Sequence, residues 1–122
     1  MTHAQALDWL YAQTRAGGRR HPGRAARLLA ALRLGPPPNV VRVVGTNGKG
    51  TVSYLVAAGL TAAGEVTGLF LSPHVERFEE RVSVDGRQVA ASDVAAFADM
   101  ARSALALDPP GPHERPAFFE LT

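Results

Sequence analysis

The chain has 122 residues, 46% hydrophobic and 20% charged, with a formal net charge of +2. These values are typical of one globular domain and exclude a disordered or fibrous chain. No run approaches the about 18 apolar residues of a membrane span, and Asp8 and Arg15 interrupt the first stretch, so we expect a cytoplasmic protein with no membrane partner. Because cysteine is absent, disulfides and thiolate metal sites are excluded, which favours magnesium-type chemistry.

Two helices are predicted in the first third of the chain. Apolar residues at helical spacing indicate an amphipathic helix that ends at Gly17-Gly18, and a second helix over residues 23–34 closes at Gly35 before three prolines. The same region holds a basic cluster: Arg19, Arg20, His21, Arg24 and Arg27. Nucleic-acid surfaces usually interleave aromatic and basic residues, whereas Trp9 and Tyr11 have the spacing of a helix core. We expect no nucleic-acid partner; a solvated face or attraction of a small anion explains the cluster.

The middle of the chain predicts a βαβ unit. Residues 40–44 are β-branched apart from Arg42 and indicate a strand buried on both faces, and residues 52–63 have helical spacing that ends at Gly64. Residues 66–71 are again apolar and predict a second strand, parallel to the first. Since a parallel sheet needs several neighbouring strands, we expect this sheet to be incomplete.

The last third predicts a hairpin and a helix. Residues 82–84 and 87–89 flank Asp85-Gly86, which readily takes the positive φ angles of a two-residue turn. Ser92 is placed to cap a helix that runs to about Leu107. After a proline-rich loop, the segment AFFELT begins a further element.

A glycine-rich loop, GTNGKGT, lies between the first predicted strand and the next helix. It departs from the usual P-loop pattern twice, because Val43 stands where the first glycine should be and Gly50 separates Lys49 from Thr51. The physical elements of a phosphate site nevertheless remain. Glycines let the backbone turn and point its N–H groups at an anion, Lys49 adds a full charge, and the Thr51 hydroxyl can reach a phosphate-bound magnesium.

Lys49 is the only lysine among thirteen basic residues. A single lysine between glycines suggests a site that needs a slim point charge, where a planar guanidinium would not fit. The alternative is chance survival in an arginine-rich composition.

Ser72 follows the second predicted strand and would face the same crevice as the loop. Pro73 favours an extended conformation at Ser72, and His74 comes next. An ordinary turn is the alternative interpretation of these three residues.

Three motifs in this order, GTNGKGT, LSPHVERFEERVSVDG and FFELT, resemble the folylpolyglutamate synthase and dihydrofolate synthase family, ATP-dependent ligases of the Mur-ligase type. The resemblance implies an α/β fold: a P-loop-type βαβ with a parallel sheet, N-terminal helices and a small β-hairpin. It makes residues 1–122 the N-terminal portion of an incomplete Mur-ligase-like ATP-binding domain. Glu80 and Arg81 match the family's Glu-Arg pair, which we interpret as a structural salt bridge.

The resemblance also implies three groups of site residues. The ATP-binding group, whose Lys49 is also the catalytic residue, is Gly45, Thr46, Asn47, Gly48, Lys49, Gly50 and Thr51. The magnesium ligands are Ser72 and Thr51. The pterin or folate contacts are Ala117, Phe118, Phe119, Glu120 and His74. Core packing is the alternative role of the two phenylalanines.

The family's members join L-glutamate to dihydropteroate or a folate: ATP phosphorylates the substrate carboxylate, and the glutamate amine attacks the acyl phosphate. The resemblance therefore implies ATP and Mg2+ as cofactors, these small molecules as partners, and a monomer when full length. The family's later metal ligands and its C-terminal domain have no counterpart in this sequence, so we expect no ligase activity from these residues alone. The alternatives are another Mur-type amino-acid ligase and a non-catalytic nucleotide-binding fragment.

Overall fold

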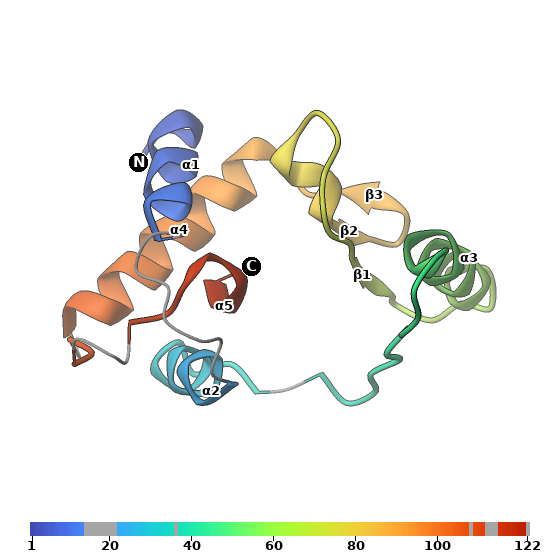
Figure 1. Ribbon diagram of the computed structural model, residues 1–122, viewed down its shortest axis with the longest axis horizontal. Coiled ribbons are helices and arrows are strands. Elements are labelled where there is room, and N and C mark those ends of the chain that lie inside the picture. Colours follow the sequence, from blue (N-terminus) through green and yellow to red (C-terminus); the bar gives the residue numbers. More distant parts are fainter. Residues whose placement is uncertain (14–21, 36, 108, 112–114, 122) are drawn as a thin grey trace. The chain divides into compact units, whose positions relative to one another are not determined.

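The computed structural model describes residues 1–13, 22–35, 37–107, 109–111 and 115–121, without the side chains of residues 119 and 120 (Figure 1). The chain divides into two compact units, Met1–Pro37 with Ser92–Thr122, and Pro38–Ala91. The composition had predicted one domain. None of the helices in the described ranges has the length and apolar character needed to cross a membrane.

The first unit is helical. Its helices are α1 (His3–Ala12), α2 (Pro22–Ala31), α4 (Ala91–Leu107) and α5 (Phe118–Leu121). Ala6 of α1 packs with Ala95 and Ala98 of α4, and Met1 and Trp9 cover this cluster. Because these alanines are small, the two helices can approach closely there.

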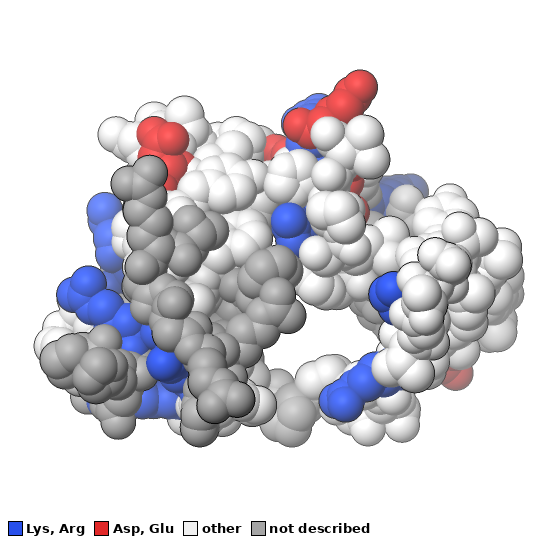
Figure 2. Space-filling view, viewed as in Figure 1, with Lys and Arg blue, Asp and Glu red and all other residues white. Residues whose placement is uncertain are grey.

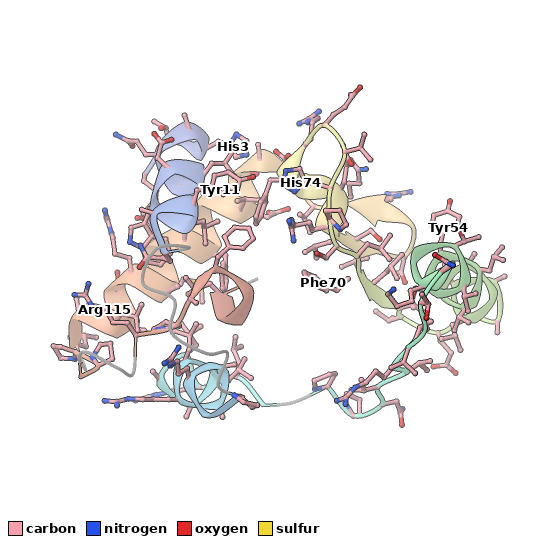
Figure 3. The ribbon with its side chains drawn as sticks, in the orientation of Figure 1. His3, Tyr11, Tyr54, Phe70, His74 and Arg115 are labelled. Carbon is pink, nitrogen blue, oxygen red and sulfur yellow. The ribbon has the colours of Figure 1, made fainter. Side chains whose placement is uncertain are left out.

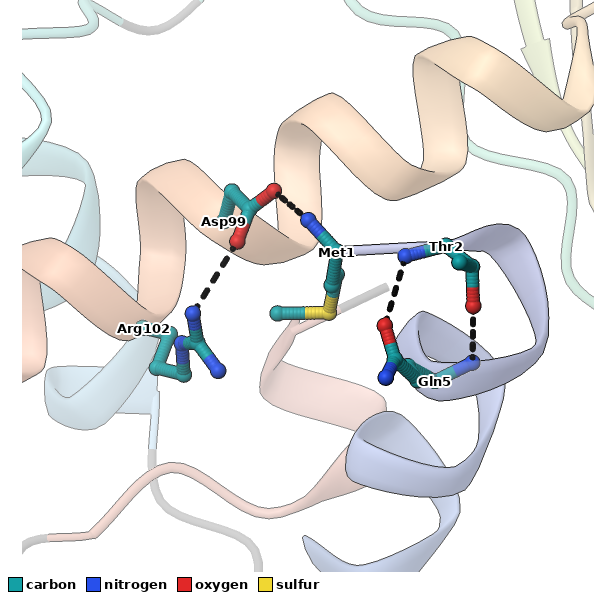
Figure 4. A network of polar contacts seen from close by, with 5 residues as sticks. All are labelled: Met1, Thr2, Gln5, Asp99 and Arg102. Carbon is teal, nitrogen blue, oxygen red and sulfur yellow. Dashed lines mark hydrogen bonds and ion pairs between the residues drawn. The ribbon is translucent and has the colours of Figure 1, made fainter.

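Local sequence explains where α1 begins. The Thr2 hydroxyl accepts a hydrogen bond from the Gln5 amide at 3.3 Å, and the Gln5 side chain accepts one from the Thr2 amide at 2.8 Å. This reciprocal pair is a capping box. The Met1 ammonium pairs with Asp99 of α4, which also accepts a hydrogen bond from Arg102 at 3.2 Å (Figure 4).

Two of the predicted helix boundaries were wrong, and the predicted end at Gly17-Gly18 lies outside the described residues. Helix α2 ends at Ala31 rather than Leu34, because Arg33 adopts a left-handed φ of 55°. The Leu34 amide then bonds to the Leu29 carbonyl and the Arg33 amide to that of Ala30, the Schellman pattern. Helix α4 begins at Ala91, so Ser92 lies in its first turn instead of capping it.

The second unit holds helix α3 (Lys49–Ala62), strand β1 (Gly68–Phe70), the 3-10 helix η2 (Phe78–Arg81), and strands β2 (Val82–Val84) and β3 (Arg87–Gln88). The strands form an antiparallel sheet in the order β1-β2-β3, with Phe70 opposite Val82 and Val84 opposite Arg87. Asp85 and Gly86 have φ angles of 49° and 76°, which confirms the predicted hairpin turn.

The predicted parallel sheet is absent from the described residues. Residues 40–44 form no strand, Val44 is 79% exposed, and β1 pairs antiparallel with β2. A strand requires a neighbour for its N–H and C=O groups, and no described segment pairs with residues 40–44.

Helix α3 confirms the helical part of the predicted unit, with Gly64 in a left-handed conformation just after its end. It packs against β1, yet none of its residues is buried. Leu55 is 64% exposed, and Tyr54 extends from the helix into solvent (Figure 3). The visible surface of α3 is almost entirely uncharged (Figure 2).

Candidate functional site

The glycine loop of the second unit leads directly into α3. Gly48 is the residue before the helix and has a φ of 75° and a ψ of 5°. This left-handed conformation is disfavoured for residues that carry a Cβ atom and is open to glycine. Gly50 lies within the first helical turn and has no positive φ. The backbone geometry therefore requires glycine at position 48 and leaves position 50 unconstrained.

Lys49, the first residue of α3, folds back over this loop. Its ammonium Nζ donates hydrogen bonds to the carbonyl of Gly45 at 2.8 Å and to that of Thr46 at 3.4 Å. The ammonium group of the chain's single lysine therefore lies against the loop that precedes the helix, in an exposed position.

The first amides of α3 are available as donors. Among the described residues, the N–H groups of Gly48, Lys49, Gly50 and Thr51 have no acceptor, and the first intrahelical bond at this end runs from Val52 to the Gly48 carbonyl at 2.9 Å. Unpaired amides at the start of a 14-residue helix carry a partial positive charge. Together with the adjacent ammonium, they form a site with the chemistry to bind an anion such as a phosphate.

The second group of candidate residues lies on the loop after β1, where Figure 3 shows His74. The Leu71 amide donates to the Arg81 carbonyl at 2.8 Å, which closes the two ends of this loop. The Arg81 guanidinium donates through Nη1 to Ser72 Oγ at 3.3 Å and through Nε to His74 Nδ1 at 2.8 Å. Ser72 and His74 are therefore brought together by one side chain.

Glu80 holds the remainder of the same loop. Its carboxylate accepts hydrogen bonds from the amides of Val75, Glu76 and Arg77 at 2.7, 3.0 and 2.7 Å. These bonds, with that from Val75 foremost, lower the pKa of the Glu80 carboxyl, and His74 contributes to the same direction.

The loop-binding roles of Glu80 and Arg81 escaped sequence reasoning, which interpreted the two residues as one salt bridge. The structure gives each its own partners: backbone amides for Glu80, and Ser72 and His74 for Arg81. A carboxylate can accept hydrogen bonds from successive backbone amides that lie a few residues before it, and this preference could have indicated the role of Glu80. No local pattern signals the contacts of Arg81.

The predicted pterin or folate contacts other than His74 belong to the first unit. Phe118 is buried, 5% exposed, and its ring stacks on Tyr11 with centroids 5.3 Å apart and planes 13° apart. This packing favours the core role for Phe118. Ala117 is half-buried just before α5, and the side chains of Phe119 and Glu120 lie outside the described part.

Comparison with known proteins finds relatives of this chain in sequence and in structure. No family model matches it. It is 30% identical over 122 residues to the dihydrofolate synthase/folylpolyglutamate synthase of Bacillus subtilis (strain 168), a match that covers 98% of this chain and 28% of the relative. The solved structure of folylpolyglutamate synthetase from Lactobacillus casei matches 99% of this chain and 31% of its own, with 29% identity and a TM-score of 0.81.

The chain belongs to the folylpolyglutamate synthase and dihydrofolate synthase family. This confirms the resemblance drawn from the three motifs. The chain spans less than a third of the length of these relatives. A further solved member of the family, described as an FPGS-AMPPCP-folate complex, matches 99% of this chain and 30% of its own, with 27% identity and a TM-score of 0.79.

Proposed function

We propose that this chain supplies the ATP phosphate-binding loop of a ligase that adds L-glutamate to dihydropteroate or to folates. The observation that carries the proposal is the start of α3, where amides without acceptors and the Lys49 ammonium occur together. Family membership supports it, as does the solved relative whose description names an ATP analogue and folate.

In this proposal the amides of Gly48 to Thr51 bind phosphate oxygens, and Gly45, Thr46 and Asn47 shape the turn that leads to them. Lys49 contributes a full positive charge near the phosphoryl group that is transferred. Negative charge on that group increases during transfer, so a fixed cation and aligned amides stabilise the transition state more than the ground state.

The protein ligands we assign to magnesium are the hydroxyls of Thr51 and Ser72. Mg2+ in such sites commonly takes one or two protein oxygens and completes its shell with phosphates and water, so a cluster of acidic ligands is not required. Within the described residues no group of three acidic or imidazole side chains is placed to hold a metal. Ser72 Oγ accepts one hydrogen bond from Arg81, and a hydroxyl oxygen has a second lone pair to offer. The ion would neutralise phosphate charge.

We assign pterin or folate contacts within each unit by itself: His74 in the second unit, and Ala117, Phe119 and Glu120 in the first. Phe118 is assigned a supporting role, because its ring is already packed against Tyr11. ADP release measured with each substrate in turn distinguishes dihydropteroate from folates.

Nucleotide binding is tested by titrating the 122-residue chain with ATP and Mg2+ in a calorimeter. Removal of a charge-assisted contact costs about 1.5–3 kcal/mol, so Lys49→Ala should weaken ATP binding by roughly tenfold or more. Arg87→Ala is the control, because it removes the same charge from exposed strand β3. Absence of ATP binding, or equal affinity in Lys49→Ala and the unaltered chain, would overturn the proposal.

Ligase function is tested in a chimera in which this chain replaces the matching 28% of the Bacillus subtilis relative. We expect ADP release that depends on both glutamate and either dihydropteroate or folate, and its loss in Lys49→Ala. The 122 residues alone should bind nucleotide without turnover, since no residue of α3 is buried and residues 40–44 pair with no described segment. Turnover by the chain alone would contradict this last inference.

A further inference from the structure

The Arg81 guanidinium is the centre of the loop that carries Ser72 and His74. Arg81 is only 6% exposed, and its Nε and Nη1 groups reach His74 Nδ1 at 2.8 Å and Ser72 Oγ at 3.3 Å. The guanidinium carbon lies 5.9 Å from the centre of the Phe78 ring, which is itself buried and lies 6.2 Å from the His74 ring. Charge, hydrogen bonds and packing therefore act on the same side chain.

The bond to Nδ1 restricts the chemistry of His74. A guanidinium is always protonated in proteins and can only donate, so Nδ1 must present its lone pair to the Nε–H of Arg81. In a neutral imidazole with a bare Nδ1, the proton resides on Nε2. The contact thus selects one of two tautomers.

We propose that Arg81 is a positioning residue that fixes His74 as the Nε2–H tautomer and, through its second bond, holds the Ser72 hydroxyl in the same loop. The role in ligation rests on the proposed function, which assigns His74 to the pterin or folate and Ser72 to magnesium. A substrate atom that pairs with His74 Nε2 must then be a hydrogen-bond acceptor, such as a carbonyl oxygen or an unprotonated ring nitrogen. A donor such as an amino group would be rejected at that position.

Long-range proton–nitrogen NMR spectra of the imidazole rings test the proposal on the 122-residue chain without nucleotide or folate. They are recorded at about pH 8, above the ordinary pKa of imidazole. The His74 signals are assigned by their loss in His74→Gln. We expect a single Nε2–H tautomer in the unaltered chain, and a mixture of tautomers in Arg81→Met, which keeps an apolar chain of similar length but no donor.

Arg77→Met is the matched control. The Arg77 side chain is 66% exposed and lies 3.5 Å from Glu79, so its loss should leave the His74 spectrum unchanged. Arg81→Lys keeps the charge without the planar fork and should restore the tautomer only in part. Hairpin amide signals show whether each variant is folded.

A proton on His74 Nδ1 in the unaltered chain would overturn the proposal even if every Arg81 variant failed to fold. An unchanged single tautomer in a folded Arg81→Met would also overturn it. No substrate is present in these spectra, so their outcome does not depend on the proposed function. If the spectra show the expected tautomer but the calorimeter detects no ATP binding, the proposed function is wrong and the positioning role of Arg81 remains supported.

Discussion

The carboxylate of Glu80 accepts a hydrogen bond from the backbone amide of Val75 at 2.7 Å, and this bond ties η2 to the loop that carries Ser72 and His74. The same carboxylate takes the next two amides through its other oxygen, Oε1. An ionised carboxylate only accepts and has two oxygens, so it can satisfy three successive donors without a competing donor of its own. One acidic side chain, that of Glu80, and one basic side chain, that of Arg81, therefore shape this loop.

Glu80→Gln should loosen this loop selectively. The glutamine oxygen can keep the two amides that Oε1 accepts, whereas its NH2 group faces the Val75 amide, a donor against a donor. We expect amide hydrogen exchange to become faster at Val75 than at Glu76 or Arg77, as measured by NMR. Glu76→Gln, at an exposed position, is the control; equal exchange at Val75 in both variants would contradict this role for Glu80.

The loop should also lose order in acid. The three amide bonds hold the pKa of the folded Glu80 carboxyl below its ordinary value. A depressed pKa means that the stabilisation is fully present above the unfolded-state pKa of about 4.3, and is lost as the pH falls through the lower folded pKa. Amide exchange at Val75, compared with the Glu80→Gln variant over that range, measures it. The two proteins should converge at the acid end, and a constant difference at all pH values would show that the charge of Glu80 is not the cause.

Local features of this chain could be predicted from sequence, because their causes are local. The Asp85-Gly86 turn depends on two residues that tolerate positive φ, and α3 was predicted from apolar residues at helical spacing that end at Gly64. The end of α2 was missed because Arg33 takes the left-handed position that glycine usually occupies.

Features that join distant residues could not be predicted in the same way. The β-branched composition of residues 40–44 favours a strand. A strand also needs a paired neighbour, and the described residues supply none for this segment. The contacts of Arg81 link positions seven and nine residues away across a loop whose path is set by other bonds. The glycine loop lies between these cases: a sharp turn at its glycines could be predicted from sequence, while the bond from the Lys49 ammonium to the Gly45 carbonyl could not.

Gly48→Ala should destabilise the start of α3. A left-handed residue with a Cβ costs about 1–2 kcal/mol, although the space around Gly48 is open. Gly50→Ala is the control: position 50 is helical, equally open and free of positive φ, so alanine there should be neutral or add about 0.5–1 kcal/mol of stability. Denaturant titration followed by the amide signals of α3 compares the two. Equal loss of stability in both would show that the left-handed backbone at Gly48 is not required.

Phe118→Ala tests whether this side chain is part of the core of the first unit or a substrate contact. The ring is 5% exposed and stacked on Tyr11, so its removal should lower the free energy of unfolding by about 3–5 kcal/mol. Unfolding is followed by the fluorescence of Trp9, the only tryptophan, which packs against the core of the same unit.

The control is Tyr54→Ala, in which an aromatic ring that is 60% exposed on α3 is removed; it should change the free energy of unfolding by no more than about 0.5 kcal/mol. Phe118→Leu should recover part of the loss, because leucine refills most of the volume without the flat ring. If Phe118→Ala and Phe118→Leu both unfold like the unaltered chain, the ring contributes nothing to the core. Phe118 would then return to the group of proposed pterin or folate contacts, where a flat ring is useful for stacking on a heterocycle.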